Sequence, residues 1–370
     1  MQILYLGLII RIIVQYINLY IFPISGLNED AFLFHFLATE FASNGTFSES
    51  FYQDQKFYSY SIFLGYIYRI FGISNIFFGS LLNIFFWFIS ALVLYTTLMT
   101  VAVKKNICNY ALLFYTFLPS SIFFSSSTFR EPLILLFTNL IIYYFVKLFK
   151  SKNINYFFLI MILLINYILA AYLHMAYLYI SIVFIIVTFF LLIYKFLKYR
   201  KIFFLFFLFF LFFLFFLFFV FFQTEITQYL VTNLIEKSAI YRSNTTHGLT
   251  SYNYLISENN LINTLFAFVQ FLFQPSFFSL SSYASYLFFF ENIIKIFMIF
   301  TFPIILIQNN TKYKFIFMIT FLLYLMITFI WSLGTTNWGT SIRHSFPQLG
   351  LLILFYFGNL NNFLSNKRVK

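Results

Sequence analysis

The chain has 370 residues, of which 62% are hydrophobic and 9% are charged, against about 25% charged in an ordinary soluble domain. Apolar runs of about 20 residues, the length that a transmembrane helix needs, recur along the whole sequence. The net charge of +12 comes largely from Lys/Arg clusters between these runs, a pattern typical of cytoplasmic loops that gives no support to nucleic-acid binding.

The composition therefore predicts an all-α integral membrane protein with a single polytopic domain over residues 1–370. The first apolar run, Ile3 to Ile24, is expected to lead outward into a first outer loop, residues 25–56, which carries five acids and one lysine. Arg11 lies within that run and either snorkels or faces the bundle interior. Glu29, Asp30 and His35 follow it directly; they are candidates for chemistry, or they only mark a loop that leaves the bilayer.

The remaining apolar runs give a membrane topology when the Lys/Arg clusters are placed on the cytoplasmic side. Residues 57–71 are too short to cross and are expected to form a re-entrant or interfacial helix. Pro275 interrupts a second such segment at Leu265–Leu280, which follows a second large outer loop, residues 223–263. The crossings are expected at Asn75–Val103, Ile107–Ser127, Leu133–Phe149, twice within Asn155–Tyr194, and at Ile202–Phe222, Tyr286–Ile307, Phe315–Leu333 and Phe346–Phe363. About ten spans and two partial ones result, with both termini cytoplasmic.

Two further polar groups are expected at the outer side. In the stretch Ser125–Pro132, Glu131 before Pro132 is ordinary helix-start chemistry. Arg130 is not explained in that way, because a cation is unfavourable at a helix N-terminus unless it helps the free amides to bind an anion. In the stretch Gly334–His344, Arg343 and His344 offer donors suited to phosphate.

These patterns favour a substrate with a phosphate head and a lipid tail. A carboxylate can act as general base towards a hydroxyl, while arginines stabilise a departing phosphate. The only cysteine, Cys108, excludes an internal disulfide. The spacing of the histidines and acids predicts no metal site, although a divalent metal stays open.

The residues quoted above resemble those of GT-C-type glycosyltransferases, multi-spanning enzymes with an acidic residue in the first outer loop. The matching stretches are Glu29–Ala31 with Phe34–His35, Tyr58–Gly72, which ends in Ile-Tyr-Arg-Ile-Phe-Gly, and Ile342–Pro347. The sequence is also similar to Wzy-type surface-polysaccharide polymerases at Pro119–Pro132, Phe273–Pro275 and Glu291–Asn292. It lacks a Trp-Trp-Asp-type motif, which argues against an oligosaccharyltransferase. Its outer loops also lack an arginine followed by ten residues and then a glycine, which weakens the polymerase hypothesis.

The resemblance implies a GT-C-like fold in the bacterial inner membrane. It implies a polyprenyl-phosphate or diphosphate sugar donor, a saccharide or lipid-linked acceptor, and contact with membrane lipid. Asp30 or Glu29, with His35 nearby, would form the catalytic group. The lipid-linked phosphate would be held by Arg130, Arg242, Arg343 and His344. A repeat-unit polymerase and a lipid-linked saccharide transporter or flippase remain alternatives, although transporters generally place ionisable groups near the bilayer midplane.

Overall fold

The computed structural model describes residues 1–24, 29–46, 58–150, 156–174, 176–196, 261–277, 280, 282–308, 313–335 and 337–367. These residues are almost entirely helical and include no strand, which confirms the all-α prediction for the described ranges. Among the described residues, five helices are long and apolar enough to cross a membrane: α1 (Gln2–Tyr20), α4 (Ile76–Thr100), α7 (Glu131–Lys150), α13 (Tyr283–Gln308) and α14 (Lys314–Gly334). The count of about ten spans stays a prediction, and the expected span Ile202–Phe222 lies outside the described residues.

The polar residues of α1 face the protein and its apolar residues face outward. Arg11, Gln15 and Asn18 are buried, whereas Ile9 and Ile13 are about half exposed. This arrangement is typical of a helix whose outer surface is in contact with lipid. Arg11 thus faces the bundle interior, one of the two alternatives for this residue.

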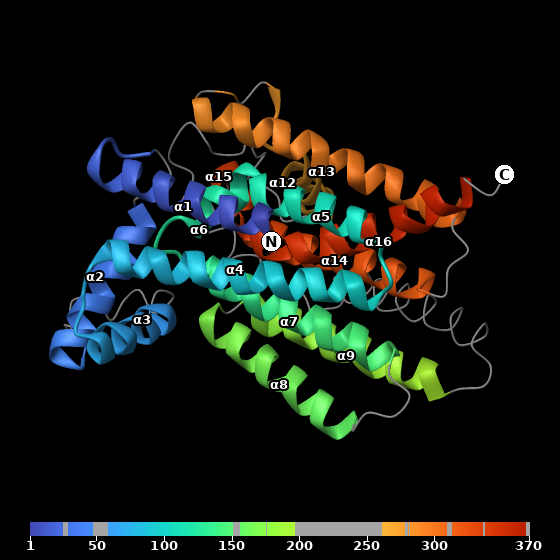
Figure 1. Cartoon of the computed structure of the whole chain (residues 1–370), viewed down its shortest axis with the longest axis horizontal. Helices are drawn as coiled ribbons and strands as arrows, with labels where there is room; N and C mark the ends of the chain where they lie inside the picture. Colours follow the sequence, from blue (N-terminus) through green and yellow to red (C-terminus); the bar gives the residue numbers. More distant parts are fainter. Residues whose placement is uncertain are drawn as a thin grey trace.

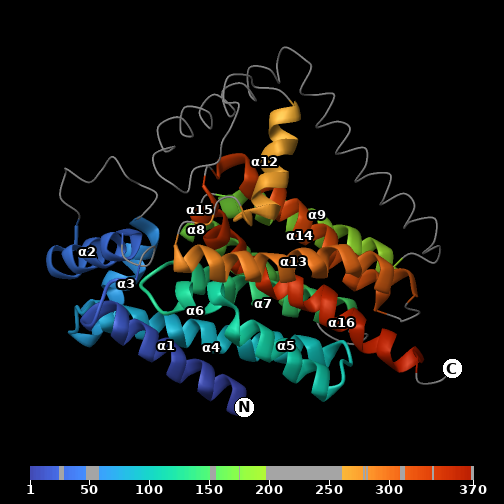
Figure 2. The ribbon, with the colours of Figure 1, turned by 90° about the horizontal axis from the view of Figure 1, so that it is seen from above.

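Helices α2 (Glu29–Asn44) and α3 (Tyr58–Phe71) pack against each other at one end of the bundle (Figures 1 and 2). Within the predicted first outer loop, the 16 residues Glu29–Asn44 form α2, and the placement of this segment on the outer side stays a prediction. Apolar residues at helical spacing, among them Phe34 and Ala38, bury that helix against α3. The two backbones approach so closely that a Cβ at Gly65 would lie 2.8 Å from the Ala38 carbonyl oxygen.

The single helix expected at Ile107–Ser127 is broken. Helix α5 (Lys105–Phe117) and α6 (Pro119–Ser125) meet at 57°. Pro119 disfavours helical backbone at the preceding residue, Leu118, whose ψ is 132°. The break separates the carbonyl of Thr116 from the amide of Ser120, which would pair in a continuous helix. Arg11 donates to the carbonyl at 3.0 Å, and Glu291 accepts from the amide at 2.6 Å.

The later helices follow the expected ranges with small shifts at their ends. Two helices turn near His174, as predicted: α8 (Tyr156–Leu173) and α9 (Ala176–Phe196). Helix α12 (Leu261–Phe273) ends before Pro275. The final expected run, Phe346–Phe363, begins as a 3-10 turn, η4 (Phe346–Gln348), between the short helix α15 (Trp338–Ser345) and α16 (Leu349–Lys367). Helices α6 and α15 lie towards the end of the bundle that carries α2 (Figure 2).

Candidate functional site

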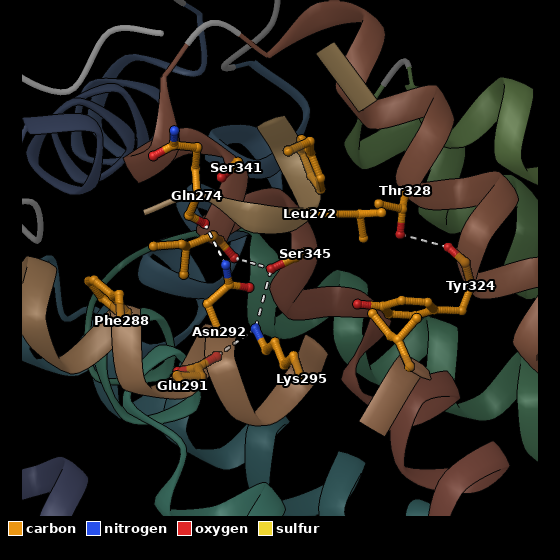
Figure 3. Close-up of a pocket in the computed structure, with 13 residues that line it drawn as sticks. Leu272, Gln274, Phe288, Glu291, Asn292, Lys295, Tyr324, Thr328, Ser341 and Ser345 are labelled. Carbon is orange, nitrogen blue, oxygen red and sulfur yellow. Dashed lines mark hydrogen bonds and ion pairs between the residues drawn. The ribbon is translucent and has the colours of Figure 1, made fainter. Parts of the chain in front are cut away.

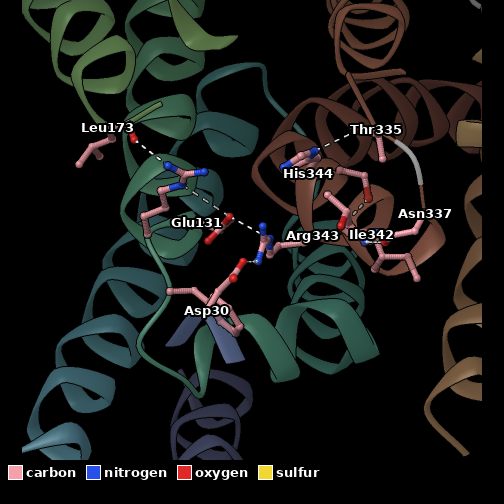
Figure 4. A network of polar contacts seen from close by, with 12 residues as sticks. Asp30, Glu131, Leu173, Thr335, Asn337, Ile342, Arg343 and His344 are labelled. Atoms are coloured by element: carbon pink, nitrogen blue, oxygen red, sulfur yellow. Dashed lines mark hydrogen bonds and ion pairs between the residues drawn. The ribbon is translucent and has the colours of Figure 1, made fainter. Parts of the chain in front are cut away.

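Four charged residues from distant parts of the sequence meet near α2, and we call them the ion cluster: Asp30, Arg130, Glu131 and Arg343 (Figure 4). The guanidinium of Arg343 forms an ion pair with Asp30, and its Nε lies 3.2 Å from Oε1 of Glu131. Nε of Arg130 lies 3.9 Å from the same oxygen. The structure thus brings together at least one residue from each of the three polar groups that the sequence analysis expected at the outer side.

Helix ends position the charged groups. Asp30 lies in the first turn of α2 and Glu131 is the first residue of α7, both places where a helix dipole favours a carboxylate. Arg343 lies in the last turn of α15, where a cation is favoured. That helix has only eight residues, and the side chain of Asn337 caps its start by accepting from the Thr340 amide at 2.7 Å.

The loop before α7 is held in place by Asn83 of α4. Its amide nitrogen donates to the carbonyls of Ser127 and Phe129, both at 2.6 Å, and its oxygen accepts from the Tyr60 hydroxyl at 2.8 Å. At the end of this loop Arg130 donates to the Leu173 carbonyl at 3.4 Å. Helices α3, α4 and α8 therefore all contribute to the placement of Arg130.

A group of buried rings adjoins the cluster. The His344 ring stacks on Trp331 with centroids 4.0 Å apart, and His174 lies 4.7 Å from Trp331 and 5.7 Å from His344. Burial and then the nearby arginines hold the pKa of both histidines well below 6.5. Both rings are therefore neutral at pH 7, so His344 brings hydrogen bonding but no positive charge to the predicted phosphate site.

The cluster combines a partly exposed side with a deep side. The side chain of Asp30 is 33% exposed and that of Arg343 is 18% exposed, whereas that of Glu131 is 3% exposed. In the described part of the chain, neither Oε2 of Glu131 nor Nε1 of Trp331 has a hydrogen-bond partner. Buried polar atoms normally have one. The site therefore offers a partly exposed carboxylate and two arginines, together with an acceptor on Glu131 and a donor on Trp331 that are not used by the described residues.

The other predicted site residues lie elsewhere or are not described. Nδ1 of His35 lies 2.9 Å from the Tyr68 hydroxyl between α2 and α3, and burial lowers the pKa of this histidine. Its described contacts are not with the ion cluster. The side chain of Glu29 and the whole of Arg242 lie outside the described residues. Within the ranges described, no three histidine, cysteine or acidic residues group to hold a metal ion, and metal dependence stays open.

Sequence reasoning missed three participants. Glu131 was interpreted only as a helix-start acid, but it also contacts Arg343 and Arg130. His174 and Trp331 had no local pattern that marked them, since their proximity depends on how the turn after α8 and helix α14 meet α15. A signal did exist for Glu131, because its neighbour Arg130 needed a counter-ion.

No protein family, no curated protein and no solved structure matches this chain. A function must therefore be argued from the chemistry of its own residues.

Proposed function

We propose that the chain is a membrane glycosyltransferase that transfers a sugar or oligosaccharide from a polyprenyl-phosphate or diphosphate donor to a hydroxyl acceptor. The observation that carries the proposal is the contact between the partly exposed Asp30 and Arg343, with Glu131 and Arg130 directly behind. A base and two anion-binding groups thereby lie within one site, among helices with exposed apolar faces.

The proposed reaction uses the two charges in different ways. The Asp30 carboxylate takes the proton of the acceptor hydroxyl while the oxygen of that hydroxyl forms a bond to the anomeric carbon of the donor sugar. The bond from that carbon to the phosphate oxygen breaks, and the electron pair leaves with the phosphate. Arg343 and Arg130 stabilise the negative charge that develops there.

The formal charge of the ion cluster is zero, because two arginines balance two carboxylates. A lipid phosphate would bind by replacing Asp30 as the partner of Arg343, which frees the carboxylate to act as base. The substitution Asp30→Asn removes the competing carboxylate. Undecaprenyl phosphate is therefore expected to bind this variant at least as tightly as the wild type, although transfer is lost.

The decisive experiment is the lipid-linked and surface glycan profile of a strain that lacks the gene, complemented with the wild type, Asp30→Asn or Glu40→Gln. Glu40 also lies on α2 and serves as the matched control. Removal of a general base lowers the rate about a hundredfold or more, so Asp30→Asn should fail to restore the missing glycan, while Glu40→Gln restores it.

The kind of glycan that is lost separates the alternatives. Loss of one sugar supports a single-sugar transferase, whereas capped single repeat units without long chains support a repeat-unit polymerase. Unchanged glycans in the deletion strain would overturn the enzyme proposal. Full rescue by Asp30→Asn would disprove the role of this carboxylate as base.

A further inference from the structure

A buried ion pair lies on α13, outside the ion cluster (Figure 3). Nζ of Lys295 lies 2.5 Å from Oε1 of Glu291, one helical turn earlier, and their side chains are 8% and 1% exposed. The small pocket beside them has room for about one water, so the pair is enclosed. Such a pair adds little stability over apolar residues of the same volume, because both charges lose their hydration. Ionisable residues among apolar helices usually have a function, and the proposed reaction uses neither of these two.

Glu291 holds the start of α6. Its carboxylate accepts from the backbone amide of Ser120 at 2.6 Å and from the hydroxyl of the same residue at 2.5 Å. Ser120 is the second residue of α6, and the first amides of a helix have no partner within that helix. Residues 126–129 then connect the end of α6 to Arg130 of the ion cluster. Glu291 is therefore bound to the helix that precedes one of the two arginines.

Lys295 contacts the end of α15. Its ammonium donates to the Ser345 hydroxyl at 3.5 Å, and that hydroxyl donates to the Ile342 carbonyl at 2.9 Å (Figure 3). Ser345 is the last residue of α15, and Arg343 lies two positions earlier. A cation is favoured at this end of a helix. A helix of eight residues is not stable alone, so its position depends on contacts of this kind.

The same face of α13 joins α6 and α15 at a second point. Phe288 precedes Glu291 by three residues and Lys295 by seven, so the three side chains lie along one face of the helix. The ring centroid of Phe288 lies 6.2 Å from that of Phe124 on α6 and 6.4 Å from that of Trp338 on α15. Through an aromatic ring and an ion pair, this face of α13 bridges the two helices from which the chain reaches the arginines of the ion cluster.

We propose that Glu291 and Lys295 are positioning residues. The pair fixes α6 and α15 relative to each other, and thereby sets the spacing of Arg130 and Arg343. Two guanidinium groups bind one phosphate only when both can reach it. That the ligand is a lipid phosphate rests on the proposed function, whereas the effect of the pair on α6 and α15 does not.

The test variant is Glu291→Leu/Lys295→Met, in the full-length protein in lipid nanodiscs. It removes both charges together and keeps their volume, so no unpaired charge stays buried, as it would in either single substitution. Backbone amides of α6 and α15 should exchange with deuterium about tenfold faster or more, while those of α9 keep their rates. The affinity for undecaprenyl phosphate should fall about tenfold, because the competent arrangement of the arginines is populated less. Lys295→Arg keeps the charge and should stay within about threefold of the wild-type affinity.

Tyr167→Phe is the matched control, because it removes a buried hydrogen bond between α8 and α9, to Thr188 at 3.1 Å. It should leave the affinity and the exchange of α6 and α15 unchanged. The inference is overturned if the double variant exchanges like the wild type in α6 and α15, or if all its helices exchange faster by the same factor. It is also overturned if the wild type binds undecaprenyl phosphate and the double variant binds it equally well. A wild type that does not bind this lipid would refute the proposed function, while the exchange rates still decide whether the pair positions α6 and α15.

Discussion

The chain buries arginine side chains in two different ways. Arg11 is fully buried, and its Cζ lies 3.4 Å from the centroid of the Trp87 ring. It donates only to uncharged oxygens: the carbonyls of Gly7 and Thr116 and the hydroxyls of Ser121 and Ser125, at 2.6 to 3.0 Å. Arg343 is 18% exposed at its side chain and binds two carboxylates, one of them a third exposed.

A charged residue among apolar helices therefore does not by itself mark a site. The neighbours of Arg11 occupy its guanidinium and include the carbonyl freed at the α5–α6 break, so it stabilises a fixed bend. Arg343 faces a partly exposed partner, which the proposed lipid phosphate would replace. The exposure of the counter-ion, more than the rarity of the cation, separates a structural arginine from a candidate functional one.

The largest effect is expected when Arg11 is removed. Arg11→Ala leaves the Thr116 carbonyl without its donor and a cavity beside Trp87, and should lower the free energy of unfolding by about 3 kcal/mol or more. SDS-induced unfolding in mixed micelles measures this change. Arg69→Ala, at an exposed arginine of α3, is the control and should cost little. A loss of about 1 kcal/mol or less in Arg11→Ala would contradict a structural role.

A smaller loss is expected when the deep carboxylate of the ion cluster is neutralised. Glu131→Gln keeps the volume and one acceptor but removes the charge that Arg343 and Arg130 share. Breaking a buried ion pair costs about 3–5 kcal/mol, and the retained acceptor reduces our expectation to about 2–3 kcal/mol. Glu131→Asp, which keeps the charge, should recover part of the loss. Equal stability of Glu131→Gln and the wild type would show that the arginines do not need this carboxylate.

The third effect is a dependence on pH. The pKa of His174 and of His344 is lower in the folded protein than the ordinary value of 6.5, so below that pH the unfolded chain binds more protons. Stability is therefore complete above about pH 6.5 and is lost as the pH falls, by up to about 1.4 kcal/mol per pH unit for each histidine. Unfolding measured from pH 7.5 to 5.0 should show this slope. The double substitution His174→Gln/His344→Gln should flatten it, and an unchanged slope would assign it to other groups.

Much of the helix pattern was predictable from composition and periodicity. The ranges of α3, α4, α7 and α14 agree with expectation to within a few residues, because long apolar runs and basic ends determine them locally. Helix α2 was not predicted as a helix, because its acids drew attention to a loop while its apolar residues at helical spacing, among them Phe34, were overlooked. The break at Leu118 follows from Pro119 and could have been predicted.

The site was predictable only in part. Scarcity of charge identified Asp30, Arg130 and Arg343, but nothing local predicts that α2 and α15 meet, since these helices are about 300 residues apart. The pairing of Glu131 with Arg343, and the rings of His174 and Trp331 beside them, result from tertiary packing. His35 illustrates the opposite case, because its proximity to Asp30 in the sequence did not place it in the cluster.

A comparison of activity with stability in the single variant Asp30→Asn separates a catalytic carboxylate from a structural one most directly. The Asp30 carboxylate of the wild type is a third exposed, and in the variant Arg343 retains its ion pair with Glu131. The free energy of unfolding should therefore change by about 1 kcal/mol or less. Glycan rescue, measured per amount of folded protein, should fall about a hundredfold or more. Normal rescue, or rescue that falls only in proportion to the folded protein, would place Asp30 with Arg11 as a structural residue and contradict the central claim.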